Sequence, residues 1–115
     1  MVEDDLAIAA MYRVKLEKEG WQVAVASDGV AGVEAAKEHR PDLVLLDIML
    51  PKLDGFGVME QLRADPATED LKVIVLSNSH GSPDSLERAR SLGVLGWLTK
   101  SSTTPTDLAQ RLSRL

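Results

Sequence analysis

The chain has 115 residues, 44% of them hydrophobic, which suits one globular domain with its own core. The sequence contains no cysteine, which excludes disulfide bonds and thiol chemistry. A formal net charge of -5 and an aromatic content of 3% argue against nucleic-acid binding by this domain alone. The N-terminus is acidic, unlike a signal peptide, and no apolar stretch is long enough to predict a membrane span. We therefore expect a cytoplasmic domain covering residues 1–115.

The first half of the chain alternates helical and extended patterns. Apolar side chains recur at helical spacing in residues 6–19, and Asp5 is placed to cap that helix. Residues 21–26 alternate as a strand does, and a second helical pattern begins after Gly29. The aliphatic run at 43–46 is too short for a helix and does not alternate, which predicts a strand buried on both faces of a parallel sheet.

The second half of the chain continues this alternation. The pattern predicts a helix, a buried strand, a helix, a short strand and a final helix, over residues 56–63, 72–77, 83–92, 94–99 and 104–115. The last helix begins with Thr104 as N-cap and Pro105 at its first position, and Leu108, Leu112 and Leu115 form its apolar stripe. Repeated alternation of strands and helices predicts a three-layer α/β sandwich with a parallel sheet.

Polar side chains follow the predicted strands at their carboxyl ends, where parallel sheets carry their chemistry. Asp47 follows the strand at 43–46, Ser77 ends the next strand and Lys100 follows the last one. Glu3 and Asp4 follow a very short first strand. Clustered carboxylates repel one another unless a cation joins them, and carboxylate oxygens suit Mg²⁺. A carboxylate nucleophile, a divalent ion, a hydroxyl and an amine are the parts needed to form and hold an aspartyl phosphate.

Four segments carry a resemblance to the receiver domains of two-component response regulators. They are Val-Glu-Asp-Asp at 2–5, Leu-Asp-Ile-Met-Leu-Pro-Lys-Leu-Asp-Gly at 46–55, Val-Ile-Val-Leu-Ser at 73–77 and Gly-Trp-Leu-Thr-Lys at 96–100. The resemblance implies a flavodoxin-like, five-stranded parallel sheet in the order 2-1-3-4-5. It also implies that the domain is no enzyme. It would instead accept a phosphoryl group from the phosphohistidine of a histidine kinase or a histidine phosphotransfer protein.

The resemblance assigns a role to each residue of the constellation. Asp47 is the expected phosphorylation site. Asp4 would bind Mg²⁺ directly, together with Asp47 and the backbone carbonyl of Met49, and Glu3 would act on the ion through water.

Three further residues would respond to the phosphoryl group. Ser77 would hydrogen-bond to it and Lys100 would pair with it. Trp97 stands where the family has an aromatic switch residue, although packing in the core is an equal reading. Phosphorylation would then alter the surface formed by residues 83–115, which would act on a downstream effector, on an output domain or in a weak homodimer.

Two other readings compete with a phosphorylated switch. The family usually has proline after the lysine, where this chain has Ser101, and Asn78 stands where small residues are frequent. Both departures keep open a non-phosphorylated pseudo-receiver that serves as a protein-interaction module, and the geometry of the Lys100–Ser101 peptide bond stays open as well. A phosphohydrolase of the haloacid-dehalogenase type is set aside, because Met49 occupies the position of its second aspartate.

The first strand of the expected sheet is truncated, since only Met1 and Val2 precede the acidic cluster. This should leave a gap between the strands at 21–26 and 42–47 and expose unpaired backbone groups, at a cost of about 1–3 kcal/mol each. We therefore expect that these residues alone do not fold as an ordinary receiver. Residues upstream of Met1, or else a strand donated by another segment or chain, would have to fill the gap. The upstream residues are favoured because the rest of the sequence shows no spare strand.

Overall fold

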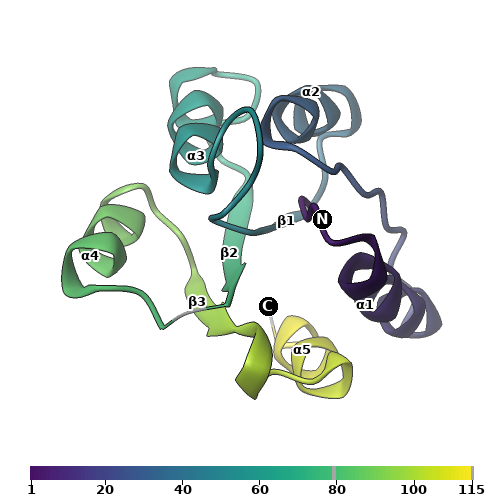
Figure 1. The fold of residues 1–115 in the computed structure, drawn as a ribbon. Coiled ribbons are helices and arrows are strands. Elements are labelled where there is room, and N and C mark those ends of the chain that lie inside the picture. The colour runs from purple at the N-terminus through teal and green to yellow at the C-terminus, as the bar shows by residue number, and fades with distance from the viewer. Residues whose placement is uncertain (79, 115) are drawn as a thin grey trace.

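The computed structural model describes residues 1–78 and 80–114 and has an α/β architecture (Figure 1). The helices in this part of the chain are α1 (Leu6–Lys18), α2 (Gly29–His39), α3 (Gly55–Ala64), α4 (Pro83–Ser91), the 3-10 turn η1 (Lys100–Ser102) and α5 (Pro105–Leu112). The strands are β1 (Leu43–Leu46), β2 (Lys72–Ser77) and β3 (Gly96–Thr99). Leu115, the last position of the expected apolar stripe, lies outside the described residues. Within the described residues, no helix is both long enough and apolar enough to cross a membrane.

The three strands form a parallel sheet in the order β1-β2-β3. Leu46 pairs with Val75, and Val75 pairs in turn with Trp97. Both β1 and β2 are buried along nearly their whole length, as their unbroken aliphatic runs predict. The last strand begins at Gly96, two residues later than expected.

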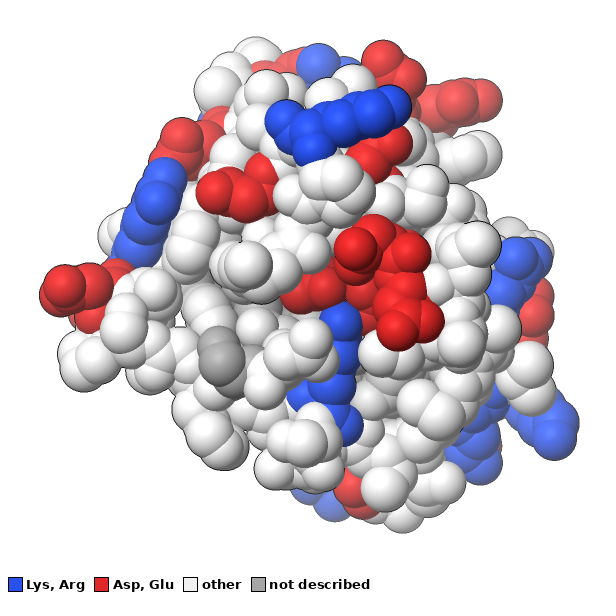
Figure 2. Space-filling model, viewed as in Figure 1, with Lys and Arg blue, Asp and Glu red and all other residues white. Residues whose placement is uncertain are grey.

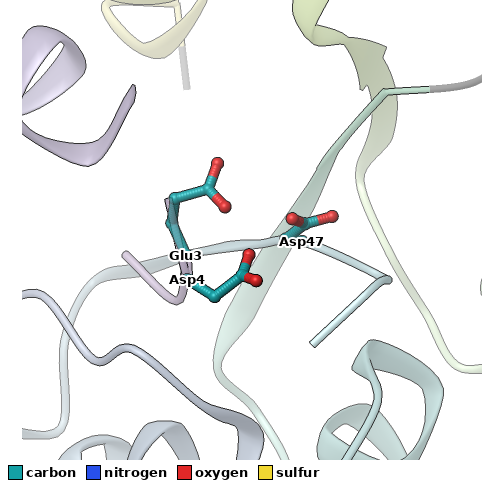
Figure 3. Close-up of side chains that lie close together, drawn as sticks. All are labelled: Glu3, Asp4 and Asp47. Carbon is teal, nitrogen blue, oxygen red and sulfur yellow. The ribbon is translucent and has the colours of Figure 1, made fainter. Parts of the chain in front are cut away.

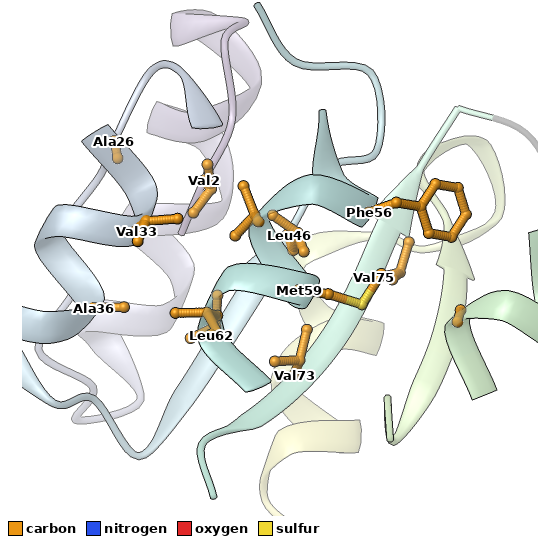
Figure 4. Packing of buried hydrophobic residues seen from close by; sticks show 13 residues of the cluster. Val2, Ala26, Val33, Ala36, Leu46, Phe56, Met59, Leu62, Val73 and Val75 are labelled. Carbon is orange, nitrogen blue, oxygen red and sulfur yellow. The ribbon is translucent and has the colours of Figure 1, made fainter. Parts of the chain in front are cut away.

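Helices cover both faces of the sheet and form two apolar layers. On one side, α2, α3 and α4 pack on the sheet through a cluster that includes Leu46, Met59, Leu62 and Val73 (Figure 4). On the other side, α1 and α5 pack on the opposite faces of the same strands through a second cluster centred on Tyr12, Ile74 and Leu108. The predicted three-layer sandwich is therefore confirmed. The strands β1 and β2 are buried on both faces because a helical layer covers each side of the sheet.

Two expectations about the sheet are not met. The described residues contain three strands rather than five. Residues 21–26, predicted as a strand, form none, since residues 21–25 belong to no strand and Ala26 forms an isolated bridge. The N-terminal segment lies between residues 21–26 and β1, where Val2 forms isolated parallel bridges with Ala26 and Leu46. A single bridge on each side does not make the ladder of successive hydrogen bonds that defines a strand. Neither segment is therefore a strand of the sheet.

Val2 nevertheless packs tightly where it lies, against the helix that crosses above it. It is 4% exposed, and a Cβ added at Gly32 in α2 would lie 2.8 Å and 2.9 Å from its two methyl carbons. Gly32 thus leaves the space that the first residues need in order to reach β1.

We predict that Gly32→Ala lowers the free energy of unfolding by about 1–3 kcal/mol, because the new methyl group overpacks against Val2. Truncating Val2 at the same time should relieve the clash, so Val2→Ala with Gly32→Ala should cost less than the sum of the two single changes. Urea denaturation of the three variants measures this coupling. Strictly additive losses would show that Val2 does not lie against Gly32.

Candidate functional site

Asp47 follows β1 directly and is 5% exposed. Its backbone N–H donates to the carbonyl of Val2 at 3.1 Å, and its Oδ1 accepts from the N–H of Met49 at 3.2 Å. The following loop folds back closely, because a Cβ at Gly55 would lie 2.5 Å from the carbonyl oxygen of Asp47. The Asp-Gly pair seen in the sequence thus allows the turn that fixes the carboxylate in place.

Two more carboxylates lie beside Asp47, carried by the N-terminal segment (Figure 3). Glu3, Asp4 and Asp47 each offer an oxygen within 4.8 Å of the others. Glu3 is buried, whereas Asp4 is exposed. Figure 2 shows a compact group of acidic side chains near the centre of this face, with basic side-chain atoms directly beside it. The predicted convergence of the acids at the carboxyl edge of the sheet is therefore what the structure contains.

Lys100 reaches into this group from the end of β3. Its Nζ donates to Oδ2 of Asp47 at 2.9 Å and also pairs with Oε1 of Glu3, and its side chain is 8% exposed. The peptide bonds of the described residues are all trans, so the Lys100–Ser101 bond is trans. The turn that carries the lysine is tied to α1, because the Tyr12 hydroxyl donates to the carbonyl of Thr103 at 2.6 Å.

Burial and pairing shift the pKa values of this group. Desolvation raises the pKa of Glu3 above its ordinary 4.5, and neighbouring Asp47 adds to the rise while Lys100 opposes it. Burial lowers the pKa of Lys100, but its bonds to Glu3 and Asp47 outweigh this effect and raise the pKa above 10.5. With all groups ionised, three carboxylates and one ammonium carry two net negative charges. Three converging carboxylate oxygens with that residual charge fit a hard divalent cation such as Mg²⁺.

The remaining predicted site residues lie at the same edge of the sheet or next to it. Ser77 is buried at the end of β2, and its strand partner Thr99 immediately precedes Lys100. Trp97 lies deeper in β3 and is half-buried, with its ring centroid 6.4 Å from that of Phe56. The structure therefore places Trp97 in packing contact with the core. The side chain of Met49, by contrast, is 74% exposed.

One feature of the site was not anticipated from the sequence, namely the ion pair between Glu3 and Lys100. The resemblance assigns Glu3 to the metal ion and Lys100 to the phosphoryl group, and it does not pair the two side chains with each other. The sequence shows both residues at the carboxyl ends of nearby strands, but the pairing also depends on how deeply both side chains are buried.

Comparison with known proteins agrees with this geometry. The family described as "Response regulator receiver domain" matches residues 1–113. The chain is 37% identical over all 115 residues to the "DNA-binding dual master transcriptional regulator RpaA" of Synechocystis, covering 46% of that protein. It is 40% identical over 92 residues to the "DNA-binding response regulator MtrA" of Mycolicibacterium paratuberculosis, covering 41% of it. The chain thus spans less than half the length of these two relatives.

Solved structures of receiver proteins have the same fold as this chain. A receiver domain protein described as CheY-like, from Methanospirillum hungatei, superposes with a TM-score of 0.89 at 25% identity, over 98% of this chain and 87% of that one. The chemotaxis protein CheY4 of Vibrio cholerae superposes with a TM-score of 0.88 at 26% identity, over 98% and 92% of the two chains.

We predict that Lys100→Met lowers the free energy of unfolding by about 3 kcal/mol near neutral pH, because it leaves two buried carboxylates without their cation. In the variant the pKa of folded Glu3 should rise further above its unfolded value. The folded state then holds a proton that the unfolded state releases, so stability is lost as pH rises through that folded pKa. The loss in free energy of unfolding, relative to the wild type, should therefore be larger at about pH 8 than at about pH 5.

Urea denaturation without Mg²⁺ at both pH values measures this difference. Lys15→Met is a matched control, because Lys15 pairs with Glu19 at 3.1 Å on the surface and should contribute little at either pH. If Lys100→Met lost the same free energy of unfolding at both pH values, a raised pKa of buried Glu3 would not be the cause of the loss.

Proposed function

Because the chain belongs to the response regulator receiver domains, we propose that residues 1–115 form a receiver that takes a phosphoryl group on Asp47. The observation that carries the proposal is the position of this carboxylate. It is fixed at the end of β1, beside two further carboxylates and in contact with the Lys100 ammonium. The donor is the phosphohistidine of a histidine kinase or a histidine phosphotransfer protein.

The transfer is a displacement at phosphorus. An oxygen of Asp47 forms a new bond to phosphorus, the bond from phosphorus to the donor imidazole nitrogen breaks, and the imidazole leaves with the electron pair and takes up a proton. Lys100 already contacts Oδ2 of Asp47 and is positioned to pair with the added phosphoryl oxygens. The chain itself is modified in this reaction, so it acts as an acceptor rather than as an enzyme.

Asp4 and Asp47 would hold Mg²⁺ directly with the carbonyl of Met49, and Glu3 would act through water. The bound ion would neutralise charge on the transferred group. This division of roles is supported by the different surroundings of the two N-terminal acids. Glu3 is buried and engaged with Lys100, whereas Asp4 is exposed and free of that ion pair.

Ser77 and Lys100 would bind the phosphoryl group and so respond to phosphorylation. A hydrogen bond from Ser77 and an ion pair from Lys100 would draw the ends of β2 and β3 toward Asp47. Trp97 would transmit this movement to the surface of residues 83–115, because it packs between Phe56 and Gly81. Binding to a downstream effector or an output domain would follow from that change.

Incubation with acetyl phosphate and Mg²⁺ tests the proposal directly. Intact mass spectrometry should show the gain of one phosphoryl group, lost in Asp47→Asn and retained in Asp54→Asn. Asp54 is a suitable control because it caps α3 through its side chain and lies outside the carboxylate group. If the wild type gained no mass, or if Asp47→Asn gained as much, the chain would be a non-phosphorylated interaction module instead.

We further predict that Asp4→Ala abolishes Mg²⁺ binding, because it removes a direct oxygen ligand, and that Glu3→Gln only weakens binding. Titration of Trp97 fluorescence in a Trp21→Phe background measures both affinities. Asp5→Asn is the control for long-range charge, since Asn can still cap α1 where Asp5 does now. Equal loss of affinity in the Asp4 and Glu3 variants would contradict the assignment of direct and indirect ligands.

A further inference from the structure

The turn that carries Lys100 has little structure of its own to fix it. It is the single 3-10 turn η1, and among the described residues no side chain caps its start. Ser101 and Ser102 are exposed, and Ser101 stands where the family usually has proline. Hydrogen bonds in such short turns have poorer geometry than those of an α-helix. The position of the turn must therefore be set by contacts from outside it.

Three contacts hold the two ends of this turn. Before it, Thr99 is the last residue of β3 and is paired in the sheet. After it, the N–H of Thr104 donates to Asp107 and the N–H of Asp107 donates to the Thr104 hydroxyl, both at 3.1 Å, which fixes the start of α5. Between the turn and α5, the carbonyl of Thr103 accepts from the Tyr12 hydroxyl at 2.6 Å. This third contact is the one that joins the turn to α1.

Tyr12 is a rigid hydrogen-bond donor. The residue is 1% exposed, and its ring packs in the apolar cluster with Leu16, Ile74 and Leu108. Burial raises the pKa of the Tyr12 hydroxyl above its ordinary 10.0, although the positive charge of Lys100 opposes the rise. The hydroxyl therefore keeps its proton and stays a donor at any pH near neutral. Because the ring is closely packed, the carbonyl that accepts this bond is held in one place.

The bond from Tyr12 completes a closed path of contacts through the carboxylate group. Helix α1 begins directly after the acidic segment at 3–5, and Tyr12 follows about two turns later. From Tyr12 the path runs through Thr103 and η1 to Lys100, and the ion pair with Glu3 returns it to the acidic segment. One helix thus carries two buried acids' neighbour segment at its start and holds the lysine turn from its middle.

We propose that Tyr12 is a positioning residue for Lys100. By holding the carbonyl of Thr103, it fixes the point from which the lysine side chain extends to Asp47. Without the hydroxyl, the exposed turn would move and the ammonium would spend less time in contact with the carboxylates. A charged group that is displaced from its productive position stabilises a reacting group less well. The effect on phosphoryl transfer rests on the function proposed above, whereas the fixing of the lysine does not.

The test uses two variants that each lose one hydroxyl hydrogen bond. Tyr12→Phe keeps the ring and its packing and removes only the donor. Thr68→Val is the matched control, because the Thr68 hydroxyl is buried and donates to the carbonyl of Leu62 at 2.7 Å. Thr68 precedes β2, so it lies toward the amino end of that strand, whereas the carboxylate group lies at the carboxyl ends. Urea denaturation confirms that both variants are folded under the conditions of the measurements.

The first measurement is made without Mg²⁺ or phosphoryl donor and is independent of phosphorylation. NMR at low temperature follows the exchange of the Lys100 ammonium hydrogens with water. Tyr12→Phe should speed this exchange by about threefold to tenfold, the range expected for the loss of one hydrogen bond, and Thr68→Val should leave it unchanged. Unchanged exchange in Tyr12→Phe would overturn the proposal, as would equal acceleration in the control.

The second measurement is the rate of phosphorylation by saturating acetyl phosphate with Mg²⁺. Tyr12→Phe should lower the rate constant by about threefold to tenfold without changing the half-saturating concentration of acetyl phosphate, and Thr68→Val should change neither. In a Lys100→Met background, adding Tyr12→Phe should lower the rate no further, because no ammonium remains to be positioned. A further loss of the same size in that background would show that Tyr12 does not act through Lys100.

The two measurements separate this proposal from the one on which it builds. If the wild type took up no phosphoryl group, the proposed function would fail, and ammonium exchange would still decide whether Tyr12 fixes Lys100. If Lys100→Met proved too unstable or too slow to measure, the rates of Tyr12→Phe and Thr68→Val would decide. Equal rates in these two variants would then overturn the role of Tyr12 in the transfer.

Discussion

The ion pairs of one lysine hold the site together. The Lys100 ammonium lies between the carboxylates of Glu3 and Asp47, and all three side chains are almost fully removed from water. Without the lysine, the two buried carboxylates would repel each other, and one would tend to take up a proton. Burial already raises the pKa of Glu3. Because the lysine neutralises only part of the charge, the exposed Asp4 leaves the group with the residual negative charge that a divalent cation needs.

The fold supplies this arrangement through the ends of its strands. Glu3, Asp47 and Lys100 come from segments far apart in the sequence, and the parallel sheet brings the ends of those segments together. Contacts outside the sheet then hold the two loops that carry Asp47 and Lys100 in place. The Tyr12 hydroxyl ties the turn after Lys100 to α1, and the close approach of Gly55 fixes the loop after Asp47. The chemistry therefore depends on both helical layers, although none of the α-helices in the described residues contributes a side chain to these ion pairs.

Much of this architecture could be predicted from the sequence, and the residues show why. The runs at 43–46 and 72–77 are aliphatic without alternation because helices cover both faces of the sheet, so their assignment as buried strands was reliable. The helix caps at Asp5 and Thr104 could be predicted equally well, because a side-chain oxygen just before a helix accepts hydrogen bonds from the free backbone N–H groups of its first turn. The carboxylate group followed from the positions of its residues just after the predicted parallel strands, whose carboxyl ends meet at one edge of a sheet.

Other features could not be read from local patterns. The alternation at 21–26 predicts a strand, but a strand requires a paired neighbour, and this segment meets the N-terminal residues in an isolated bridge between Ala26 and Val2. Likewise, the pairing of Glu3 with Lys100 depends on how deeply both are buried. The sequence does not encode that depth locally.

The most direct test of the account is a crystal structure of the chain with Mg²⁺ and beryllium fluoride, a stable substitute for a phosphoryl group. The account predicts beryllium bonded to an oxygen of Asp47, the ion in contact with Asp4 and Asp47, and the Lys100 ammonium moved from the Asp47 carboxylate onto a fluoride. An intact contact between Lys100 and Asp47, with beryllium fluoride absent from Asp47 or bound to another acid, would contradict the central claim that Asp47 is the phosphoryl acceptor.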